Sequence, residues 1–450
     1  MVVDRVLPFP YFESNKGIQT RDVAWRRAVG NLFIKSYINM NEIAPVARKD
    51  LEFFPVQHDG QQFVLIRDHL GLVEEGKAVG IPLYQLMTRL DGTTTVRDLQ
   101  MALMRQREGM LVGTDEINRL LAHLDEAFLL DSERYKNAKN RIISDFTSDR
   151  IRPCSHCGKS YPETPSELKI RLDEILNSQP PNSEPEGNVT ALIAPHIDLN
   201  VGYKGYSTAY QMLKRTSPSR IILLGVGHTL QNALFSLTDK DFETPLGITQ
   251  SDQETIRRLR EAGPDIIAPD DFIHRSEHSI EFQLIFLQHL IADKDFTIIP
   301  ILCGSIQAGL SEYSRRAYLE HAGRFLDELR LILNDPDEKT ILVAGVDFSH
   351  TGPKFGHEMP ASQLQGRSEE HDRNLLMHLT RLDTDNFWEE SKRVNDQFNV
   401  CGFSALACLL EILPQCRGEL LSYDIWHEAP TRSAVSFASV VFTSRGGMGT

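Results

Sequence analysis

The chain has 450 residues with a formal net charge of -14, 41% hydrophobic and 24% charged residues, a composition typical of globular proteins. The acidic balance and the lack of a long basic stripe argue against nucleic-acid binding, which requires clustered Lys and Arg. No apolar run reaches the ~18 residues of a membrane span and no signal peptide is recognisable, so we expect no membrane partner and a cytoplasmic location.

Residues 1–145 are expected to form a small domain whose core lies at about 60–140. Thr95 precedes Asp98 by three residues, which is the spacing of a capping box at a helix start. Apolar spacing predicts a strand, three helices and a final strand or wing at 62–68, 82–90, 95–106, 114–130 and 129–142. This order indicates a winged helix.

The stretch "LDGTTTVRDL" and the hydrophobic spacing around it resemble the PqqD-like domains, which are small winged helices. The resemblance covers about eighty residues and implies a peptide partner in a peptide-modifying pathway. A plain structural winged helix explains the same pattern equally well, because a fold alone does not specify a function. The acidic residues throughout disfavour a DNA-reading role.

Residues 146–187 are rich in Ser, Pro, Asn and Glu and are expected to be a linker, clearest at 177–188 and interrupted by a helical piece at 165–176. The six cysteines are scattered along the chain, so we expect reduced thiols. Within this segment Cys154 and Cys157 are a candidate metal-binding pair. They supply only half of a zinc site, because no second pair with matching spacing exists.

From residue 188 to residue 450, apolar runs rich in Val and Ile alternate with helical stretches. The runs are "NVTALIAP", "RIILLGVG", "FTIIPILCG", "TILVAGVD" and "AVSFASVVFT". This alternation predicts an α/β domain with a largely buried sheet. The clearest amphipathic helices are expected at 279–292 and 309–333.

Three histidines each follow one of these apolar runs: His196, His228 and His350. Because the carboxyl ends of strands line the ligand crevice of an open α/β sheet, these side chains are expected to converge. His196 and His228 are separated by about one strand-helix-strand unit, which predicts neighbouring strands. One such histidine alone is more often a hydrogen-bonded turn residue than a ligand, but three in the same position favour a site.

Cys401 stands where an apolar helical pattern begins, and a helix N-terminus favours the thiolate that a metal requires. Two imidazoles and one thiolate with an open position would form a catalytic metal site. His274 and His278 could form a helix-start cluster facing that site, and Glu277 could simply complement the helix dipole. The other cysteines of this domain are expected to be core or surface thiols.

Six motifs then follow one another in the order found in the Memo-like family, the B component of the AmmeMemoRadiSam systems. They are "APHIDLNVGYKGYSTAY", "ILLGVGH", "ETPLGITQSD", "EHSIEFQLIFLQ", "VDFSHTG" and "CGFSAL". The resemblance spans about 188 to 445. It implies a three-layer α/β domain with a central, mostly parallel or mixed sheet like that of the class III extradiol dioxygenases.

Carried over by position, the resemblance makes His196, His228 and Cys401 metal ligands, with the cysteine where the dioxygenases have a carboxylate. His350 matches the dioxygenase acid/base histidine, and Asp347 is expected to be its close neighbour. The family commonly has Ala-Gly where this chain has Ile197-Asp198, so Asp198 could tune or join the ligands. The candidate residues around the metal or substrate are Asp198, Tyr203, Glu277 and His278.

The function implied is a non-haem, Fe(II)-dependent, dioxygenase-like redox enzyme linked to a peptide or a radical SAM partner protein. Thiolate ligation widens the choice of metal toward copper and zinc. A peptide-binding or metal-handling adaptor without turnover and a metal-dependent hydrolase are the alternative hypotheses. The sequence predicts no oligomeric state.

Overall fold

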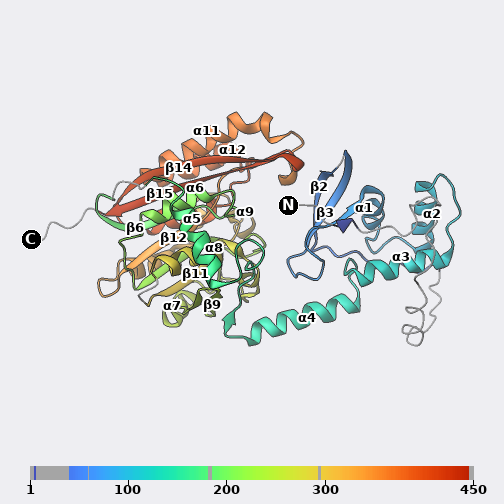
Figure 1. Cartoon of the computed structure of the whole chain (residues 1–450), viewed down its shortest axis with the longest axis horizontal. Coiled ribbons are helices and arrows are strands. Elements are labelled where there is room, and N and C mark those ends of the chain that lie inside the picture. Colours follow the sequence, from blue (N-terminus) through green and yellow to red (C-terminus); the bar gives the residue numbers. More distant parts are fainter. Residues whose placement is uncertain (1–4, 7–39, 59, 181–184, 292–294, 445–450) are drawn as a thin grey trace, which may run out of the picture. The chain divides into compact units, whose positions relative to one another are not determined.

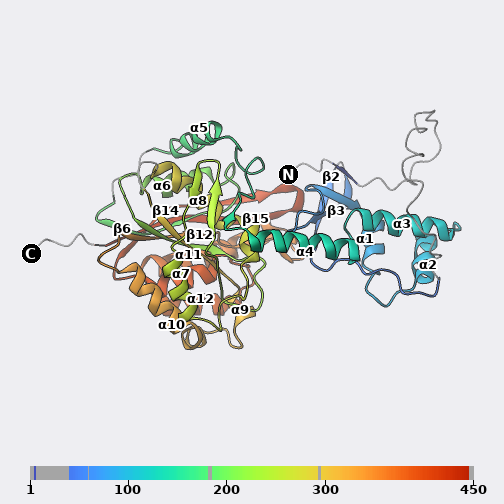
Figure 2. The ribbon, with the colours of Figure 1, turned by 90° about the horizontal axis from the view of Figure 1, so that it is seen from below.

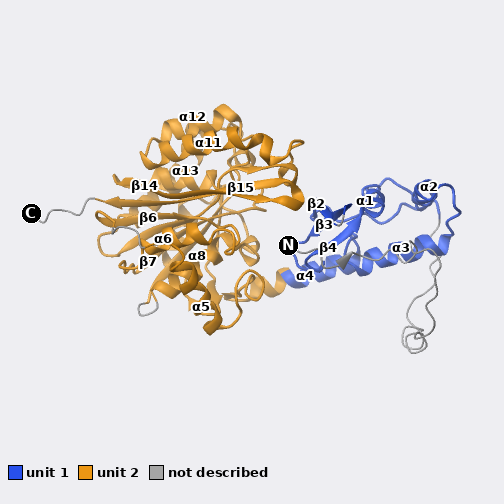
Figure 3. Cartoon of the chain, turned by 45° about the horizontal axis from the view of Figure 1, so that its top comes forward, with its two compact units in different colours: residues 1–142 blue, residues 143–450 orange. Residues whose placement is uncertain are grey.

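The computed structural model describes residues 5–6, 40–58, 60–180, 185–291 and 295–444. The chain folds into two compact units, residues 1–142 and residues 143–450 (Figure 3). Across the described ranges, no helix is both long enough and apolar enough to cross a bilayer.

Unit 1 contains a four-stranded sheet with the strand order β1-β4-β3-β2 and a core shared by its strands and helices (Figure 1). The capping box predicted at Thr95 is present, because its hydroxyl accepts from Asp98 N and the Asp98 carboxylate accepts from Thr95 N. The elements are β1 (Arg5–Val6), β2 (Glu52–His58), β3 (Gln61–Arg67), β4 (Lys77–Gly80), α1 (Ile81–Met87), α2 (Val96–Gln106) and α3 (Thr114–Glu126). The next helix, α4 (Glu133–Ser148), begins in unit 1 and ends in unit 2.

The strand or wing expected at 129–142 is wrong, because most of this segment belongs to α4, Glu133–Ser148. Ser132 caps the helix: its Oγ accepts a hydrogen bond from Tyr135 N at 3.3 Å. The helix itself contains neither Gly nor Pro, so no residue interrupts it. The β-hairpin of unit 1 precedes the helices instead and consists of β2 and β3.

Unit 2 contains an eight-stranded mixed sheet, which confirms the predicted α/β class. Strands β6, β12, β7 and β11 are parallel, whereas β8 and β15 pair antiparallel with their neighbours. The order is β13-β15-β6-β12-β7-β11-β8, and β14 pairs with β15. The strands are β6 (Asn188–Ala194), β7 (Arg220–Val226), β8 (Phe235–Leu237), β11 (Thr297–Cys303), β12 (Thr340–Gly345), β13 (His350–Thr351), β14 (Arg417–Glu428) and β15 (Ser433–Ser444).

Helices cover both faces of this sheet (Figures 1 and 2). In β6, Ala191 and Ile193 belong to the core with α7, α10, α11, α12 and α13, whereas Leu192 and Ala194 belong to the core with α5, α6 and α8. This alternation is that of a strand buried on both faces. The helices are α5 (Pro165–Leu176), α6 (Tyr203–Gln211), α7 (Gln253–Ala262), α8 (His278–Leu290), α9 (Ile306–Gly309), α10 (Arg315–Leu333), α11 (Ala361–Thr380), α12 (Thr384–Val394) and α13 (Phe403–Ile412), with short 3-10 turns at η2 (Phe272–Arg275), η3 (Pro353–Phe355) and η4 (Ala429–Thr431).

The segment expected to be a linker, residues 146–187, is largely folded into unit 2. Its β5 (Ile151–Arg152) pairs with β9 (Asp241–Thr244), which in turn pairs with β10 (Gly247–Thr249). The predicted helical piece is α5, whose Leu168 and Leu172 are fully buried. The polar composition led to a wrong prediction of a linker, because the polar residues occupy the exposed positions between these buried apolar residues. Residues 181–184 lie outside the described residues.

The strands that end before His196 and His228 are not neighbours, contrary to the prediction. β12 pairs with both β6 and β7 and therefore lies between them. All three strands are parallel, so their carboxyl ends still meet at one edge of the sheet. The crossover to β12 comes from far along the chain, which spacing between His196 and His228 could not indicate.

Candidate metal centre

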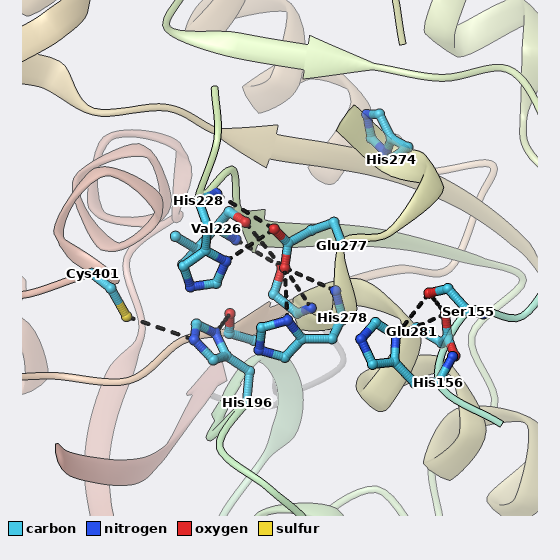
Figure 4. Close-up of polar contacts among 12 residues, drawn as sticks. Ser155, His156, His196, Val226, His228, His274, Glu277, His278, Glu281 and Cys401 are labelled. Atoms are coloured by element: carbon cyan, nitrogen blue, oxygen red, sulfur yellow. Dashed lines mark hydrogen bonds and ion pairs between the residues drawn. The ribbon is translucent and has the colours of Figure 1, made fainter. Parts of the chain in front are cut away.

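Three predicted ligands do converge at this edge. Single donor atoms of His196, His228 and Cys401 all lie within 4.8 Å of one another. A further group among the described residues, His228, Glu277 and His278, meets the same criterion. The side chains come from the ends of β6 and β7 and from the starts of α8 and α13 (Figure 4).

His196 is held in one orientation by the end of β12. Its Nδ1 lies 2.9 Å from Gly345 O, so Nδ1 carries the proton and Nε2 is left to bind a metal. Position 345 requires glycine, because a Cβ there would clash with Ser279 O and lie 2.6 Å from Gln283 Nε2. Burial lowers the pKa of His196, which keeps the imidazole in the neutral form that metals bind.

His228 is oriented in the same way by a carboxylate. Its Nδ1 lies 2.9 Å from Glu277 Oε2, and the other Glu277 oxygen accepts from the N–H groups of His278 and Ser279 at 2.9 and 3.0 Å. Burial alone would raise the pKa of Glu277, but His228, His278 and the Ser279 N–H hold it well below its usual range. Glu277 therefore caps α8 and also orients a candidate ligand.

His278 closes the cluster on the α8 side. Its ring stacks on His228 and meets His196 edge to face, each with 5.1 Å between ring centroids. Burial, opposed by Glu277, lowers the pKa of His278 well below its ordinary value. His274, considered for the same cluster, points away from it (Figure 4), and its Nε2 is buried without a hydrogen-bond partner.

Cys401 completes the donor set just before α13. Its Sγ lies 3.7 Å from His196 Nε2, close to the roughly 3.6 Å that bonds of about 2.05 and 2.3 Å to one tetrahedral zinc-like ion would give. The predicted thiolate is wrong for this structure: burial and the Asp347 carboxylate raise the pKa of Cys401 well above its usual value. A metal must therefore displace the thiol proton.

Asp347 contacts His196 rather than His350. Its Oδ1 accepts from His196 N at 3.1 Å, and its Oδ2 lies 3.6 Å from His196 Nε2. His350 Nδ1 bonds instead to Phe348 O at 2.9 Å. Burial and, to a lesser extent, His196 and His228 lower the pKa of His350 to about 3.

Two other predicted residues stand outside the cluster. Asp198 is exposed, and its Oδ1 accepts from Asn200 N at 2.9 Å within a turn. It therefore does not join the ligands. Tyr203 begins α6 and packs against the core that the sheet shares with α5, α6 and α8. The motif "APHIDLNVGYKGYSTAY" correctly indicates the turn after β6. Among its residues, His196 is the only one in the donor group.

Cys154 and Cys157 are joined by a disulfide, so they are neither the reduced thiols that were expected nor, in this state, the candidate metal pair. His156, which lies between these two cysteines, was not among the predicted site residues. His156 lies against His278 with 5.6 Å between ring centroids, although its position in the sequence follows no apolar strand. The only signal in the sequence for His156 was its position between two cysteines, shortly after Arg152.

We expect Glu277→Gln to weaken metal binding about 10- to 100-fold, the usual effect of removing a group that orients a ligand. The amide cannot offer two acceptor oxygens to His228 Nδ1 and the start of α8. Competition between the protein and a chromophoric chelator for Zn²⁺ measures the change. Glu254→Gln is the matched control, because Glu254 lies in the first turn of α7 but is exposed and pairs with Arg257. Equal losses in both variants would refute the orienting role.

Comparisons with known proteins show which family this chain is similar to. The model of the Memo-like protein family matches residues 152–441. A MEMO1 family protein of Aquifex aeolicus is 32% identical over 395 residues, covering 87% of this chain and 99% of its own. A MEMO1 family protein of Thermus thermophilus is 27% identical over 77% of this chain and 98% of its own.

The likeness to the Aquifex protein extends into unit 1, because 87% of the chain is more than unit 2 contains. A solved structure of an uncharacterized Escherichia coli K12 protein is a weak match, with a TM-score of 0.35, 17% identity and coverage of 56% of this chain and 99% of its own. The family model and the Aquifex relative are decisive by their extent: this chain belongs to the Memo-like family.

Proposed function

We propose that unit 2 is a non-haem metal-dependent redox enzyme of the dioxygenase-like type, with His196, His228 and Cys401 as the ligands. The observation that carries the proposal is the convergence of these three donors within 4.8 Å. The Nδ1 atoms of both histidines are already engaged by Gly345 O and Glu277, which directs Nε2 of each ring toward the shared space. Three protein ligands leave a position for substrate.

The donor set suits Fe(II), copper or zinc, since imidazole binds all three and the thiolate favours the softer ones. Bound Fe(II) would supply a centre at which dioxygen and a substrate hydroxyl react together. The protein would fix the geometry through residues held by backbone atoms: Gly345 O orients His196, and the Asp347 carboxylate fixes its main chain. Such fixed groups lose little freedom when substrate binds.

Proton handling is assigned to Asp347 and His350. Burial raises the pKa of Asp347, and its Oδ2 lies 3.6 Å from His196 Nε2. His350 stays neutral at pH 7 because its pKa is about 3, and with Nδ1 engaged by Phe348 O its Nε2 can accept a hydrogen bond from a substrate hydroxyl. His350 is thus an orienting acceptor more than a proton store.

Oxygen uptake tests the proposal. Protein purified without oxygen and loaded with Fe(II) is expected to consume O₂ in the presence of catechols. His350→Gln is expected to lower the rate about 10-fold, because the variant loses an oriented hydrogen-bond acceptor worth roughly 1.5 kcal/mol. His427→Gln, at an exposed histidine of β14, is the matched control. Hydrolysis of an ester substrate by the Zn²⁺ form without O₂ uptake would favour a hydrolase instead.

For unit 1 we propose peptide binding, in a pathway that would include a radical SAM partner protein. The supporting observation is a cavity of about 520 Å³ in this unit, lined by Gln85, Thr88, Arg89, Ala102, Arg105 and Gln106. The guanidinium groups of Arg89 and Arg105 and the amides of Gln85 and Gln106 suit an acidic peptide. Calorimetry of the full chain with acidic and basic peptides tests it, and binding without any turnover by unit 2 would favour an adaptor.

A further inference from the structure

The turn formed by residues 154–157 lies beside the histidine cluster. His156 meets His278 at 5.6 Å and Phe282 at 5.5 Å between ring centroids, and His278 in turn contacts both His196 and His228 (Figure 4). Any movement of this turn therefore reaches a candidate ligand through two ring contacts. The proposed function makes no use of the turn.

The buried carboxylate of Glu281 holds the backbone of this turn in place. Glu281 of α8 pairs with Arg152 and accepts from Ser155 N at 3.1 Å, His156 N at 2.9 Å and Tyr161 OH at 2.5 Å. Both Arg152 and Glu281 are fully buried. These bonds fix the backbone between the two cysteines and the side chains of the flanking Arg152 and Tyr161 without any contribution from the sulfur atoms.

The disulfide itself adds little to the stability of the fold. It joins residues three apart, and the stabilisation from a cross-link falls as the closed loop becomes shorter. Cys154 and Cys157 are both half-buried, so a small thiol can reach them. A two-residue spacing between cysteines is also the spacing of redox-active pairs in oxidoreductases.

We propose that Cys154 and Cys157 are a redox-active pair, reduced by a dithiol, and that its state is transmitted through His156 to His278. In the step, a thiolate of the dithiol attacks one sulfur and the Cys154–Cys157 bond breaks. The second thiol of the dithiol then attacks the mixed disulfide and releases the remaining cysteine as a thiol. Two electrons and two protons pass to the pair, and the dithiol becomes its own disulfide.

Reduction would open the covalent loop while Glu281 keeps Ser155 N and His156 N in place. The freedom gained lies in the two cysteines and in the His156 ring, which is partly exposed and whose Nδ1 lies 2.7 Å from Ser155 Oγ and 3.6 Å from Glu281 Oε2. The pair would thus tune the surroundings of His278 rather than unfold the turn. This second step rests on the proposed function in taking the cluster as a metal site.

The test uses the metal-free full chain, titrated with reduced and oxidised dithiothreitol. Alkylation followed by mass spectrometry should show Cys154 and Cys157 gaining two thiols together at one midpoint, reversibly. Histidine-ring NMR of the same samples should show shifts of the His156 and His278 signals. Because no metal is present, these results are independent of whether the proposed enzyme function holds.

The double variant Cys154→Ser/Cys157→Ser should fold and lack the NMR shift, and Cys416→Ser, at a half-buried cysteine just before β14, should keep it. A pair that resists excess dithiothreitol in folded protein would overturn the proposal, as would a double variant that unfolds. Thiols that appear without any change at His278 would overturn the transmission through His156. Tight Zn²⁺ capture by the reduced pair would mark a metal site instead and would also overturn it.

Discussion

Cys401→Ala is expected to lower the affinity of unit 2 for Zn²⁺ or Fe(II) by more than about 100-fold, beyond the loss caused by removing an orienting group. The reason is geometric: Cys401 Sγ lies 3.7 Å from His196 Nε2, and no other sulfur belongs to the donor group among the described residues. Without it, two imidazoles remain. Elemental analysis of anaerobically purified protein and chelator competition measure the change.

The matched control is Cys416→Ala, which removes a half-buried thiol outside the donor group. Binding should also strengthen as pH rises toward the ordinary thiol range in wild-type protein, because burial raises the pKa of Cys401 and the metal must displace its proton. The alanine variant should lose this dependence. Unchanged metal content in Cys401→Ala would defeat the assignment of the site.

Arg152→Met is expected to lower the free energy of unfolding of unit 2 by about 3–5 kcal/mol, the cost of breaking a buried ion pair by removing one partner. Arg152 and Glu281 are both fully buried, and the variant leaves a carboxylate without its cation. Urea unfolding followed by tryptophan fluorescence measures the loss, because Trp388 is buried in unit 2.

The sign of the pH dependence follows from Glu281. Burial would raise its pKa, but Arg152, His156 and Tyr161 hold it well below the ordinary value of a glutamate. The pair therefore contributes its full stability above about pH 4.5 and loses it as the pH falls toward the depressed pKa. The difference between wild type and Arg152→Met should shrink over that acid range.

Arg257→Met is the control for this comparison. Arg257 is exposed and pairs with Glu254 and Glu261 on α7, so its replacement should cost less than about 1 kcal/mol. A similar loss in both variants would show that the charge of the arginine, and not its burial against Glu281, determines the stability.

The candidate ligands could be found from the sequence because each follows a regular local pattern. His196 and His228 come directly after apolar strands, and strand ends meet wherever a parallel sheet forms. Cys401 precedes an apolar helix in the same way. In each case the neighbouring residues alone specify the strand or helix, and the parallel sheet then brings the strand ends together.

The supporting residues could not be found in this way. Gly345, Glu281 and Arg152 act on groups more than a hundred residues away, through contacts that depend on β12 lying between β6 and β7 and on the turn at 154–157 folding back onto α8. Composition also suggested a linker where a buried arginine anchors the chain. Short polar stretches are ambiguous because the same residues suit a solvated loop or a covered turn.

The sequence by itself determined the α/β class of unit 2, most helices and strands, and the three donors, because hydrophobic periodicity and strand-end position are local properties. Only the tertiary structure decided that Gly345 O engages Nδ1 of His196 and Glu277 engages Nδ1 of His228, that Asp347 contacts His196, that His350 has a pKa of about 3, and that Cys154 pairs with Cys157. Those features depend on burial and on distances between atoms far apart in the chain. Periodicity contains no information about either.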